Sequence, residues 1–257
     1  MLDDVTATRY AVPLREGGSL PGIVEAEDDG TYVAKLRGAG QGVKVLVAEV
    51  VVAGLARRLG IAVPHLVALD LPAAIARFEA DEEVQDLLTA SVGPNLGVDY
   101  LPGSFGYDGS RPAAPEVAAP ILWLDAWTAN VDRTWSNPNL LLWHDRVWAI
   151  DHGAALWFHH AWARRAPDAA RFVAQPFDAS EHVLLDLVTP GALAAQQERA
   201  AGLLTDDVLT EVVAEVPDGW LEPTDQLPTT ADVRAAYVDH LGRRLAAPAA
   251  WLPGGPS

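Results

Sequence analysis

The order of strand-like and helical segments constrains the fold of this chain more than any other feature of its sequence. Residues 6–12 and 31–36 have the composition of strands, with a shorter apolar stretch at residues 23–24 between them. Residues 43–60 repeat apolar side chains at helical spacing, and the Ala- and Leu-rich sequence beyond residue 160 favours several helices. Strands first and helices last predict an α+β protein.

A Pro- and Gly-rich stretch at residues 102–115 predicts a boundary between two lobes. The N-terminal lobe, residues 1–102, is expected to hold an antiparallel sheet with a glycine-rich loop at residues 17–22. The C-terminal lobe, residues 103–257, is expected to be mainly helical, with one β-hairpin over residues 139–150. The chain is therefore predicted to be two-lobed.

Composition narrows the classes of function. The 257 residues include no cysteine, which excludes disulfides and thiolate chemistry, and the net charge of −17 disfavours nucleic acid as a partner. No apolar run approaches the roughly 18 residues needed to span a membrane, and the first residues have no signal-peptide pattern. We therefore expect a cytoplasmic protein that binds neither nucleic acid nor a membrane.

The segment at residues 130–153 has the most informative arrangement of polar residues. Asp132 follows an expected helix, Asn137 and Asn139 come next, and Asp151 follows the hairpin in an Asp-x-Gly sequence. Phosphoryl transfer from Mg-ATP requires such groups, because one carboxylate positions or deprotonates the acceptor hydroxyl and oxygen ligands hold Mg²⁺ against the phosphates. Each residue alone is more often a cap or turn residue. Their order and spacing together favour catalysis.

Lys35 and Glu49 give an independent indication. The 18 basic residues include only two lysines, and Lys35 ends an expected strand in the sequence Val-Ala-Lys. Glu49 lies on an apolar face of the helix that follows, where a carboxylate is costly unless it is paired. We therefore expect a Lys35–Glu49 ion pair. The alternative is that both side chains are solvated.

The order of these motifs resembles that of the HipA-like serine/threonine kinases and, more distantly, the phosphatidylinositol 3- and 4-kinases. The motifs are the glycine-rich loop, Val-Ala-Lys, the helical Glu, Asp-Arg followed by Asn, and Ile-Asp-His-Gly. The resemblance implies a protein-kinase-like fold that binds ATP and Mg²⁺ and phosphorylates a hydroxyl group. By position it implies that Asp132 is the catalytic base and that Asp151 binds the metal. It also implies that Lys35 contacts the phosphates, with Glu49 as its partner.

The identity of the metal-binding asparagine stays open. Asn137 has the usual kinase spacing from Asp132, whereas Asn139 enters the following strand directly, as the metal-binding asparagine of kinases normally does. His152 stands where an aromatic residue commonly follows the metal-binding aspartate. This difference puts in doubt any switch based on burying that ring, but it leaves metal binding untouched.

Two further segments are expected to contact the nucleotide. Backbone N–H groups of the glycine-rich loop can cradle phosphates, although an ordinary hairpin loop has a similar composition. The resemblance also raises autophosphorylation of Ser19 in this loop. The strand end before the Pro- and Gly-rich stretch corresponds to a kinase hinge, whose backbone meets the adenine. The expected nucleotide-binding residues are Lys35, Gly18, Ser19, Gly22, Val98, Asp99, Tyr100 and Leu101.

The leading hypothesis is an ATP-dependent phosphotransferase that phosphorylates a serine or threonine hydroxyl of a protein. The sequence does not identify the acceptor, and a small-molecule hydroxyl is an open alternative. A nucleotide-binding pseudokinase that scaffolds a partner is a second hypothesis, and nucleotidyl transfer with the same residues is a third. The expected ligands are ATP and Mg²⁺.

Overall fold

The computed structural model describes residues 1–14, 21–40, 42–77 and 81–254. The chain divides into two compact units. Unit 1 comprises Met1–Val47 and Pro64–Pro102, and unit 2 comprises Ala48–Val63 and Gly103–Ser257. The sequence analysis placed residues 48–63 in the N-terminal lobe, whereas these residues pack with unit 2. The boundary of the functional lobes stays a prediction.

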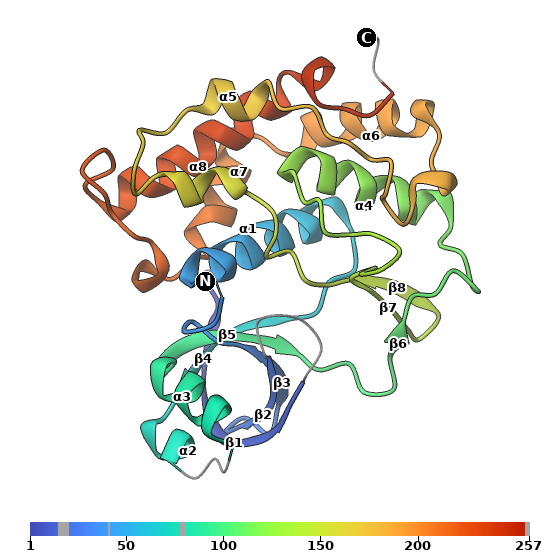
Figure 1. Cartoon of the computed structure of the whole chain (residues 1–257). Helices are drawn as coiled ribbons and strands as arrows, with labels where there is room; N and C mark the ends of the chain where they lie inside the picture. Colours follow the sequence, from blue (N-terminus) through green and yellow to red (C-terminus); the bar gives the residue numbers. More distant parts are fainter. Residues whose placement is uncertain (15–20, 41, 78–80, 255–257) are drawn as a thin grey trace. The chain divides into compact units, whose positions relative to one another are not determined.

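Unit 1 is built on a closed barrel of five strands (Figure 1). The strands pair in the order β1-β2-β3-β5-β4. Every pairing is antiparallel except that of β1 with β4, which is parallel and closes the barrel. The sequence predicted the antiparallel strands but not this closing pair. The strands are β1 (Asp3–Pro13), β2 (Gly22–Ala26), β3 (Thr31–Lys35), β4 (Leu66–Leu71) and β5 (Gly93–Asp99).

Alternate side chains of the strands fill the barrel. Val24, Ala34 and Leu69 have no exposed surface, because successive residues of a barrel strand point alternately into the core and outward. Two short helices pack on the same core: the first contributes Ala76, and the second contributes Val84 and Leu88. These helices of unit 1 are α2 (Ala73–Arg77) and α3 (Glu82–Ala90).

Helix α1 (Val43–Leu59) crosses the border between the units. Residues 46–53 are each at most 2% exposed, which is the behaviour of a helix that is apolar on all sides. In unit 2 the C-terminal part of α1 is tied to α7 (Asp206–Ala214), because Arg58 forms an ion pair with Glu211 at 2.8 Å. The predicted helix over residues 43–60 is therefore present.

Unit 2 is mainly helical and contains a three-stranded sheet, β6-β7-β8 (Figure 1). Helix α4 forms its centre, because every residue from 118 to 128 is buried and α6 and α8 pack against it. The elements are β6 (Phe105–Gly106), α4 (Pro115–Thr128), β7 (Leu140–Trp143), β8 (Arg146–Ala149), α5 (Ala169–Val173), α6 (Pro190–Leu203), α7 and α8 (Thr230–Leu245), with 3₁₀ turns at Trp157–Ala161, Leu185–Leu187, Asp218–Trp220 and Pro248–Ala250.

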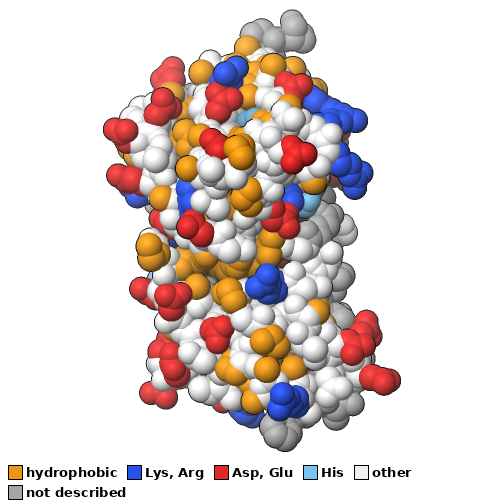
Figure 2. Space-filling view, turned by 90° about the vertical axis from the view of Figure 1, so that its left-hand side faces the viewer, with side chains coloured by type: hydrophobic (Ala, Val, Ile, Leu, Met, Phe, Trp, Pro, Cys, Tyr) orange, Lys and Arg blue, Asp and Glu red, His pale blue; other side chains and the backbone are white. Residues whose placement is uncertain are grey.

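Acidic side chains are scattered over the face that Figure 2 shows and do not gather in one patch. This distribution agrees with the excess of 35 acidic over 18 basic residues in the sequence. Within the described ranges, no helix combines the length and the apolar character that crossing a membrane requires.

Candidate active site

The loop that joins α4 to β7 carries three of the candidate residues. Helix α4 ends at Thr128, because Ala129 has a left-handed backbone with a φ of 56°. The N–H of Asn130 then donates to the C=O of Asp125 at 2.8 Å, which closes the last turn. The chain leaves the helix in a defined direction, and Asp132 follows in an exposed position.

A buried ionic cluster supports this loop. Asp125 and Arg133 are both buried, and Nε of Arg133 donates to Oδ2 of Asp125 at 2.5 Å. Nδ2 of Asn130 donates to Oδ1 of Asp125 at 3.0 Å, and Nε2 of His182 lies 3.1 Å from Oδ2. Burial alone would raise the pKa of Asp125, but the charge of Arg133 and the hydrogen bond from His182 outweigh burial and lower this pKa below its usual range. Asp125 is therefore ionised.

Arg133 also connects the loop to the two chain segments at the base of the β7–β8 hairpin. Its Nη1 donates to the C=O of Asn139 and, at 3.3 Å, to the C=O of Ile150. Its Nη2 lies 3.4 Å from Nδ1 of His152. The planar guanidinium has five N–H donors in fixed directions, so a single side chain can hold several segments at once. Arg133 thus fixes the chain before β7 and the chain after β8.

Asp132 is held through both its side chain and its backbone. Nδ2 of Asn137 donates to Oδ2 of Asp132 at 2.9 Å, which orients the carboxylate. The N–H of Asp132 donates to Oδ1 of Asn130 at 3.3 Å, and its C=O accepts from Nδ2 of Asn139 at 3.4 Å. The result is an exposed carboxylate of defined orientation, which is what a group needs to accept a proton from a bound hydroxyl.

Asp151 and Asn139 flank the base of the hairpin. Their backbones are left-handed, with φ values of 54° and 49°, a region that aspartate and asparagine tolerate better than most residues. Leu140 pairs with Ala149, and the N–H of Ile150 donates to the C=O of Asn139 at 3.0 Å, so Asn139 and Asp151 come from neighbouring chain ends. A carboxylate and an amide oxygen are donors that suit Mg²⁺.

The donor set fits a metal that arrives with a nucleotide. In the part of the chain that the structure describes, no group of three or more His, Cys, Asp or Glu side chains could hold a metal ion. Magnesium in nucleotide sites is bound by one or two protein carboxylates together with phosphate oxygens and water. Asp151 with one asparagine matches this requirement and does not match a structural zinc site.

Arg244 of α8 positions the end of α4 from another direction. Its side chain is fully buried, and it donates to the C=O groups of Trp127 and Ala126, each at 2.9 Å. It also donates to the C=O of Gln175 at 2.9 Å. Burial lowers the pKa of Arg244 to about 10, so the group stays charged at neutral pH. The helix that supplies Asp125 is therefore anchored at its C-terminus.

Lys35 and the expected hinge lie on neighbouring strands of unit 1. Lys35 is half-buried and pairs with Leu96 of β5, the strand that runs into the hinge. The N–H of Asp99 donates to the C=O of His65 at 2.8 Å, and the N–H of Tyr100 donates to the C=O of Thr31 at 2.9 Å. Burial raises the pKa of Asp99. The expected hinge residues are Val98, Asp99, Tyr100 and Leu101.

The glycine-rich connection between β1 and β2 is described only in part. Gly18 and Ser19 lie outside the described residues. Gly22 begins β2, and a Cβ atom at this position would lie 2.2 Å from the Tyr10 ring. The glycine at this position is therefore explained by the close approach of Tyr10. Its contact with a nucleotide stays a prediction.

Glu49 of α1 is only 2% exposed. Its helix neighbours Val52 and Ala53 are buried as well, so the carboxylate requires a polar or charged partner. Lys35 belongs to unit 1 and Glu49 to unit 2. The ion pair between them stays a prediction.

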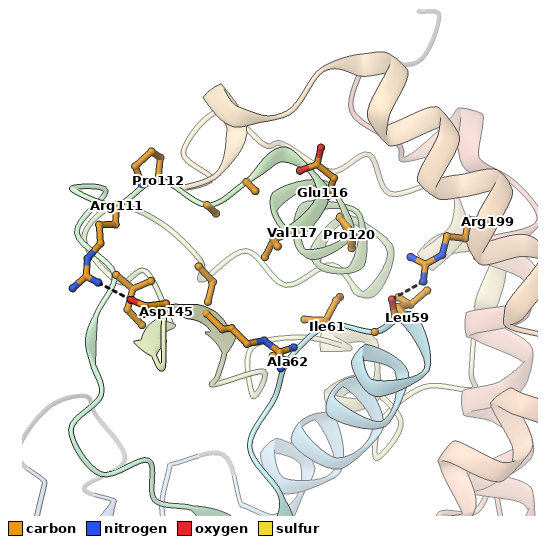
Figure 3. A pocket seen from close by; sticks show the side chains of 16 residues that line it. Leu59, Ile61, Ala62, Arg111, Pro112, Glu116, Val117, Pro120, Asp145 and Arg199 are labelled. Carbon is orange, nitrogen blue, oxygen red and sulfur yellow. Dashed lines mark hydrogen bonds and ion pairs between the residues drawn. The ribbon is translucent and has the colours of Figure 1, made fainter.

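A cavity of about 550 Å³ lies in unit 2 beside the turn of the hairpin (Figure 3). Arg111 pairs with Asp145 of the turn at 3.2 Å, and Nη2 of Arg199 donates to the C=O of Leu59 at 3.1 Å. Asn139 and Asp151 lie instead at the base of the hairpin, at the end opposite its turn. This cavity is lined by none of the four candidate residues Asp132, Asn137, Asn139 and Asp151.

The sequence analysis missed the positioning residues Asp125, His182 and Arg244. Asp125 stands alone among apolar residues in a buried helix, and this isolation is a signal that it needs a charged partner. His182 is separated from Asp125 by 57 residues, and Arg244 meets α4 only through backbone carbonyls. Neither of these two residues has a local sequence pattern that would identify its role.

Comparison with known proteins relates the chain to kinases. A family model described as HipA-like kinase matches residues 10–252. No curated protein matches the chain significantly. The crystal structure of a Helicobacter pylori proinflammatory kinase, CtkA, is similar with a TM-score of 0.53 and 9% identity, over 91% of this chain and 90% of that chain.

The Golgi casein kinase with Mn/ADP bound is also similar, with a TM-score of 0.46 and 12% identity, over 96% of this chain and 73% of that chain. A second structure of the Golgi casein kinase has a TM-score of 0.44 and 12% identity. At sequence identities this low, the similarity to these structures concerns the fold alone. The predicted α+β, protein-kinase-like fold is confirmed.

Proposed function

Because the chain belongs to the HipA-like kinase family, we propose that it transfers the γ-phosphate of Mg-ATP to a serine or threonine hydroxyl of an acceptor protein. The observation that carries this proposal is the arrangement around Arg133. One buried guanidinium holds the loop of Asp132 and both chain ends of the hairpin that presents Asn139 and Asp151. Groups that must act on the same phosphate are thereby fixed to one support.

Asp132 is the proposed base. The acceptor oxygen forms a bond to the γ-phosphorus as its proton passes to the Asp132 carboxylate. The bond between the γ-phosphorus and the bridging oxygen breaks, and ADP leaves with that electron pair. The amide of Asn137, 2.9 Å from the carboxylate, keeps Asp132 in one orientation for this transfer.

Asp151 and Asn139 are the proposed metal ligands. Mg²⁺ bound there would offset the negative charge of the phosphates. Asn139 is the better candidate of the two asparagines, because it lies at the hairpin base and its Nδ2 donates to the C=O of Asp132. That hydrogen bond leaves the amide oxygen of Asn139 for the metal. Asn137 already donates to the carboxylate of Asp132 and is better suited to orienting it.

Unit 1 is proposed to supply the nucleotide contacts. Lys35 would bind the α- and β-phosphates, and the buried carboxylate of Glu49 would hold its ammonium group in place. The adenine would meet the backbone of residues 98–101 through groups other than the N–H groups of Asp99 and Tyr100, because both of these donate within unit 1.

The test follows label from the γ-phosphate of ATP into dephosphorylated casein, with Asp132→Asn and Asp145→Asn compared with the wild type. Wild type should label serine or threonine, and the acceptor should gain the mass of a phosphoryl group and not of AMP. Asp132→Asn should lower kcat about 10²- to 10⁴-fold without changing the free energy of unfolding, because Asp132 is exposed. Asp145 is an exposed aspartate with positive φ on the same hairpin, so Asp145→Asn should keep full activity. Absence of label with wild type, or equal labelling by Asp132→Asn, would contradict the proposal.

A further inference from the structure

The two most exposed large apolar side chains of unit 2 flank the proposed base. Apart from Met1, the highest exposed fractions of large apolar side chains among the described residues are 68% for Val131 and 56% for Trp135. Val131 immediately precedes Asp132, and Trp135 follows it by three positions. Apolar side chains scattered singly over a surface need no explanation, but two of them beside one reactive group indicate a contact surface for a second molecule.

Trp135 lies at the tip of a tight turn that is joined to Asp132. The N–H of Thr134 donates to the C=O of Asn137, and the N–H of Asn137 donates to the C=O of Thr134, each at 3.1 Å. Trp135 and Ser136 form the tip between these two hydrogen bonds. The side chain of Asn137 donates to the carboxylate of Asp132 at 2.9 Å. The turn that carries Trp135 is therefore connected directly to the carboxylate that is proposed to accept the proton.

The indole ring of Trp135 is ordered by two contacts. Tyr107 is buried, and its ring stacks on that of Trp135 with the centroids 6.4 Å apart and the planes at 27°. Gly109 has a φ of 77°, and a Cβ atom at this position would lie 2.9 Å from Cη2 of Trp135. More than half of the Trp135 side chain stays exposed beside these contacts. A ring that is ordered in advance loses little conformational entropy when it binds a partner.

Asp108 supplies a negative charge beside this ring. It is exposed and lies in the chain between Tyr107 and Gly109, which both contact Trp135. Its Oδ1 accepts from the N–H of Ser110 at 2.9 Å, and hydrogen bonds from Ser110 lower the pKa of Asp108. A carboxylate has about four acceptor sites, so Asp108 can accept further hydrogen bonds from a ligand.

The basic side chain nearest in the chain to Asp108 is engaged elsewhere. Arg111 contributes to the lowered pKa of Asp108, but its Nη1 lies 3.2 Å from Oδ1 of Asp145. Its guanidinium also lies over the ring of Phe105, 5.0 Å from the centre. Within the described ranges, Asp108 forms no ion pair. The charge of Asp108 is therefore available to a ligand.

The chain segment opposite the turn has the same sign of charge. Thr134 forms an isolated antiparallel bridge with His182. Residues 176–183 include the exposed Asp178 and Glu181, and they include no lysine or arginine. Complementary charges steer and select partners, so this surface favours a cationic one.

We infer that Trp135 and Asp108 bind an arginine of the acceptor protein that lies close in sequence to the phosphorylated serine or threonine. Tryptophan gives the strongest attraction of a cation to an aromatic face, and the planar guanidinium can stack on the indole while it donates to a carboxylate. Val131 contacts an apolar part of the same acceptor segment. This inference rests on the proposed function, because it describes the acceptor on which Asp132 acts.

The test compares arginine with citrulline, which has a similar planar end group without the charge. Peptide libraries contain a central serine and carry arginine or citrulline at one flanking position in turn, and their degenerate positions omit arginine and lysine. Label from the γ-phosphate of ATP is followed into each library. At one flanking position, wild type should label the arginine library at least about threefold faster than the citrulline library.

Variants of the full chain assign this preference to the two residues. Trp135→Leu and Asp108→Asn should each reduce the preference for arginine, whereas Trp135→Phe, which keeps an aromatic ring, should retain part of it. Phe105→Leu is the matched control, because Phe105 is an exposed aromatic residue of the same unit, and it should keep the full preference. If Trp135 served structure alone, Trp135→Leu would lower labelling of both libraries by the same factor, and that result would overturn the assignment.

Equal labelling of the arginine and citrulline libraries by wild type at every position would also overturn the assignment and would leave the proposed function intact. If wild type labels no library, the proposed function fails, and a binding measurement without nucleotide decides the assignment separately. For this measurement, the same libraries with alanine in place of serine are passed over the immobilised full chain. Stronger retention of the arginine library by wild type but not by Trp135→Leu would support the arginine site, and equal retention of both libraries would overturn it.

Discussion

The two units position their candidate residues by different physical means. In unit 1, Lys35 is placed by a closed barrel, whose strands are joined by backbone hydrogen bonds around an apolar core. In unit 2, Asp132 and Asp151 lie in loops that converge on the buried pair of Asp125 and Arg133. A barrel spreads its stability over many weak contacts, whereas a buried charged network depends on every member. Single polar substitutions should therefore be far more damaging in unit 2.

Arg133→Met should have the largest effect. It leaves the carboxylate of Asp125 buried without its cation and releases both chain ends of the hairpin. Breaking a buried ion pair by removing one partner costs about 3–5 kcal/mol, so urea unfolding should show a loss of this size. Phosphotransfer should fall below detection.

A double variant provides the control for that prediction. Arg133→Met combined with Asp125→Leu removes both charges, and replacing a buried pair by apolar groups is often neutral for stability. The double variant should recover much of the lost free energy of unfolding but none of the activity, because the hairpin ends stay unattached. Recovery of activity as well would show that Arg133 serves stability alone.

Leu69→Ala tests the barrel at one of its buried positions. The side chain has no exposed surface, and truncating a buried leucine costs about 2–5 kcal/mol through lost burial and the cavity left behind. At temperatures where the variant stays folded, its kcat should equal that of wild type. The neighbouring core side chains share the lost packing, so Lys35 should keep its position. A selective loss of kcat in the folded variant would remove the contrast between the two units.

The pH dependence of stability should report on Asp125. Its pKa is lowered in the folded protein, so its contribution is complete above the unfolded value of about 3.9 and is lost as the pH falls from there toward the folded pKa. Urea unfolding between about pH 5 and pH 3 should therefore show a steeper loss for wild type than for Asp125→Asn. Equal slopes would mean that Asp125 is not the ionised member of the cluster.

Arg9→Gln should have the smallest effect. Arg9 of β1 forms an ion pair with Glu25 of β2, but both side chains are well exposed. Surface ion pairs are screened by solvent and contribute little. Neither unfolding nor phosphotransfer should change measurably. A clear loss of stability would show that unit 1 also relies on individual charges.

The resemblance to HipA-like kinases, drawn from short motifs, is confirmed by the family match over residues 10–252. Local composition and periodicity predict the hairpin, α1 and α4. They also place Asn139 before the first strand of the hairpin and Asp151 after the second, so that both lie at its base. These features depend on residues close together in the chain, which is why the sequence reveals them.

Features that depend on distant residues were not predicted. The parallel pairing of β1 with β4 joins strands about sixty residues apart, and no local pattern encodes it. The contact of His182 with Asp125 joins a loop to a helix 57 residues away. Asp125 could have been identified from the sequence, since it is the one charged residue of the apolar stretch 117–127 and a buried charge requires a partner.

The proposed function predicts that binding of Mg-ATP depends on both Lys35 and Asp151. Calorimetric titration of Mg-ATP into wild type, Lys35→Met and Asp151→Asn tests it most directly, with Arg9→Gln as the control. We predict binding by wild type and Arg9→Gln, with affinity reduced at least about tenfold in each of the other two, because each loses a charged contact worth roughly 1.5–3 kcal/mol. Chelation of Mg²⁺ should lower the affinity of wild type for ATP but should change the affinity of Asp151→Asn little. Unchanged affinity in either Lys35→Met or Asp151→Asn would contradict the account.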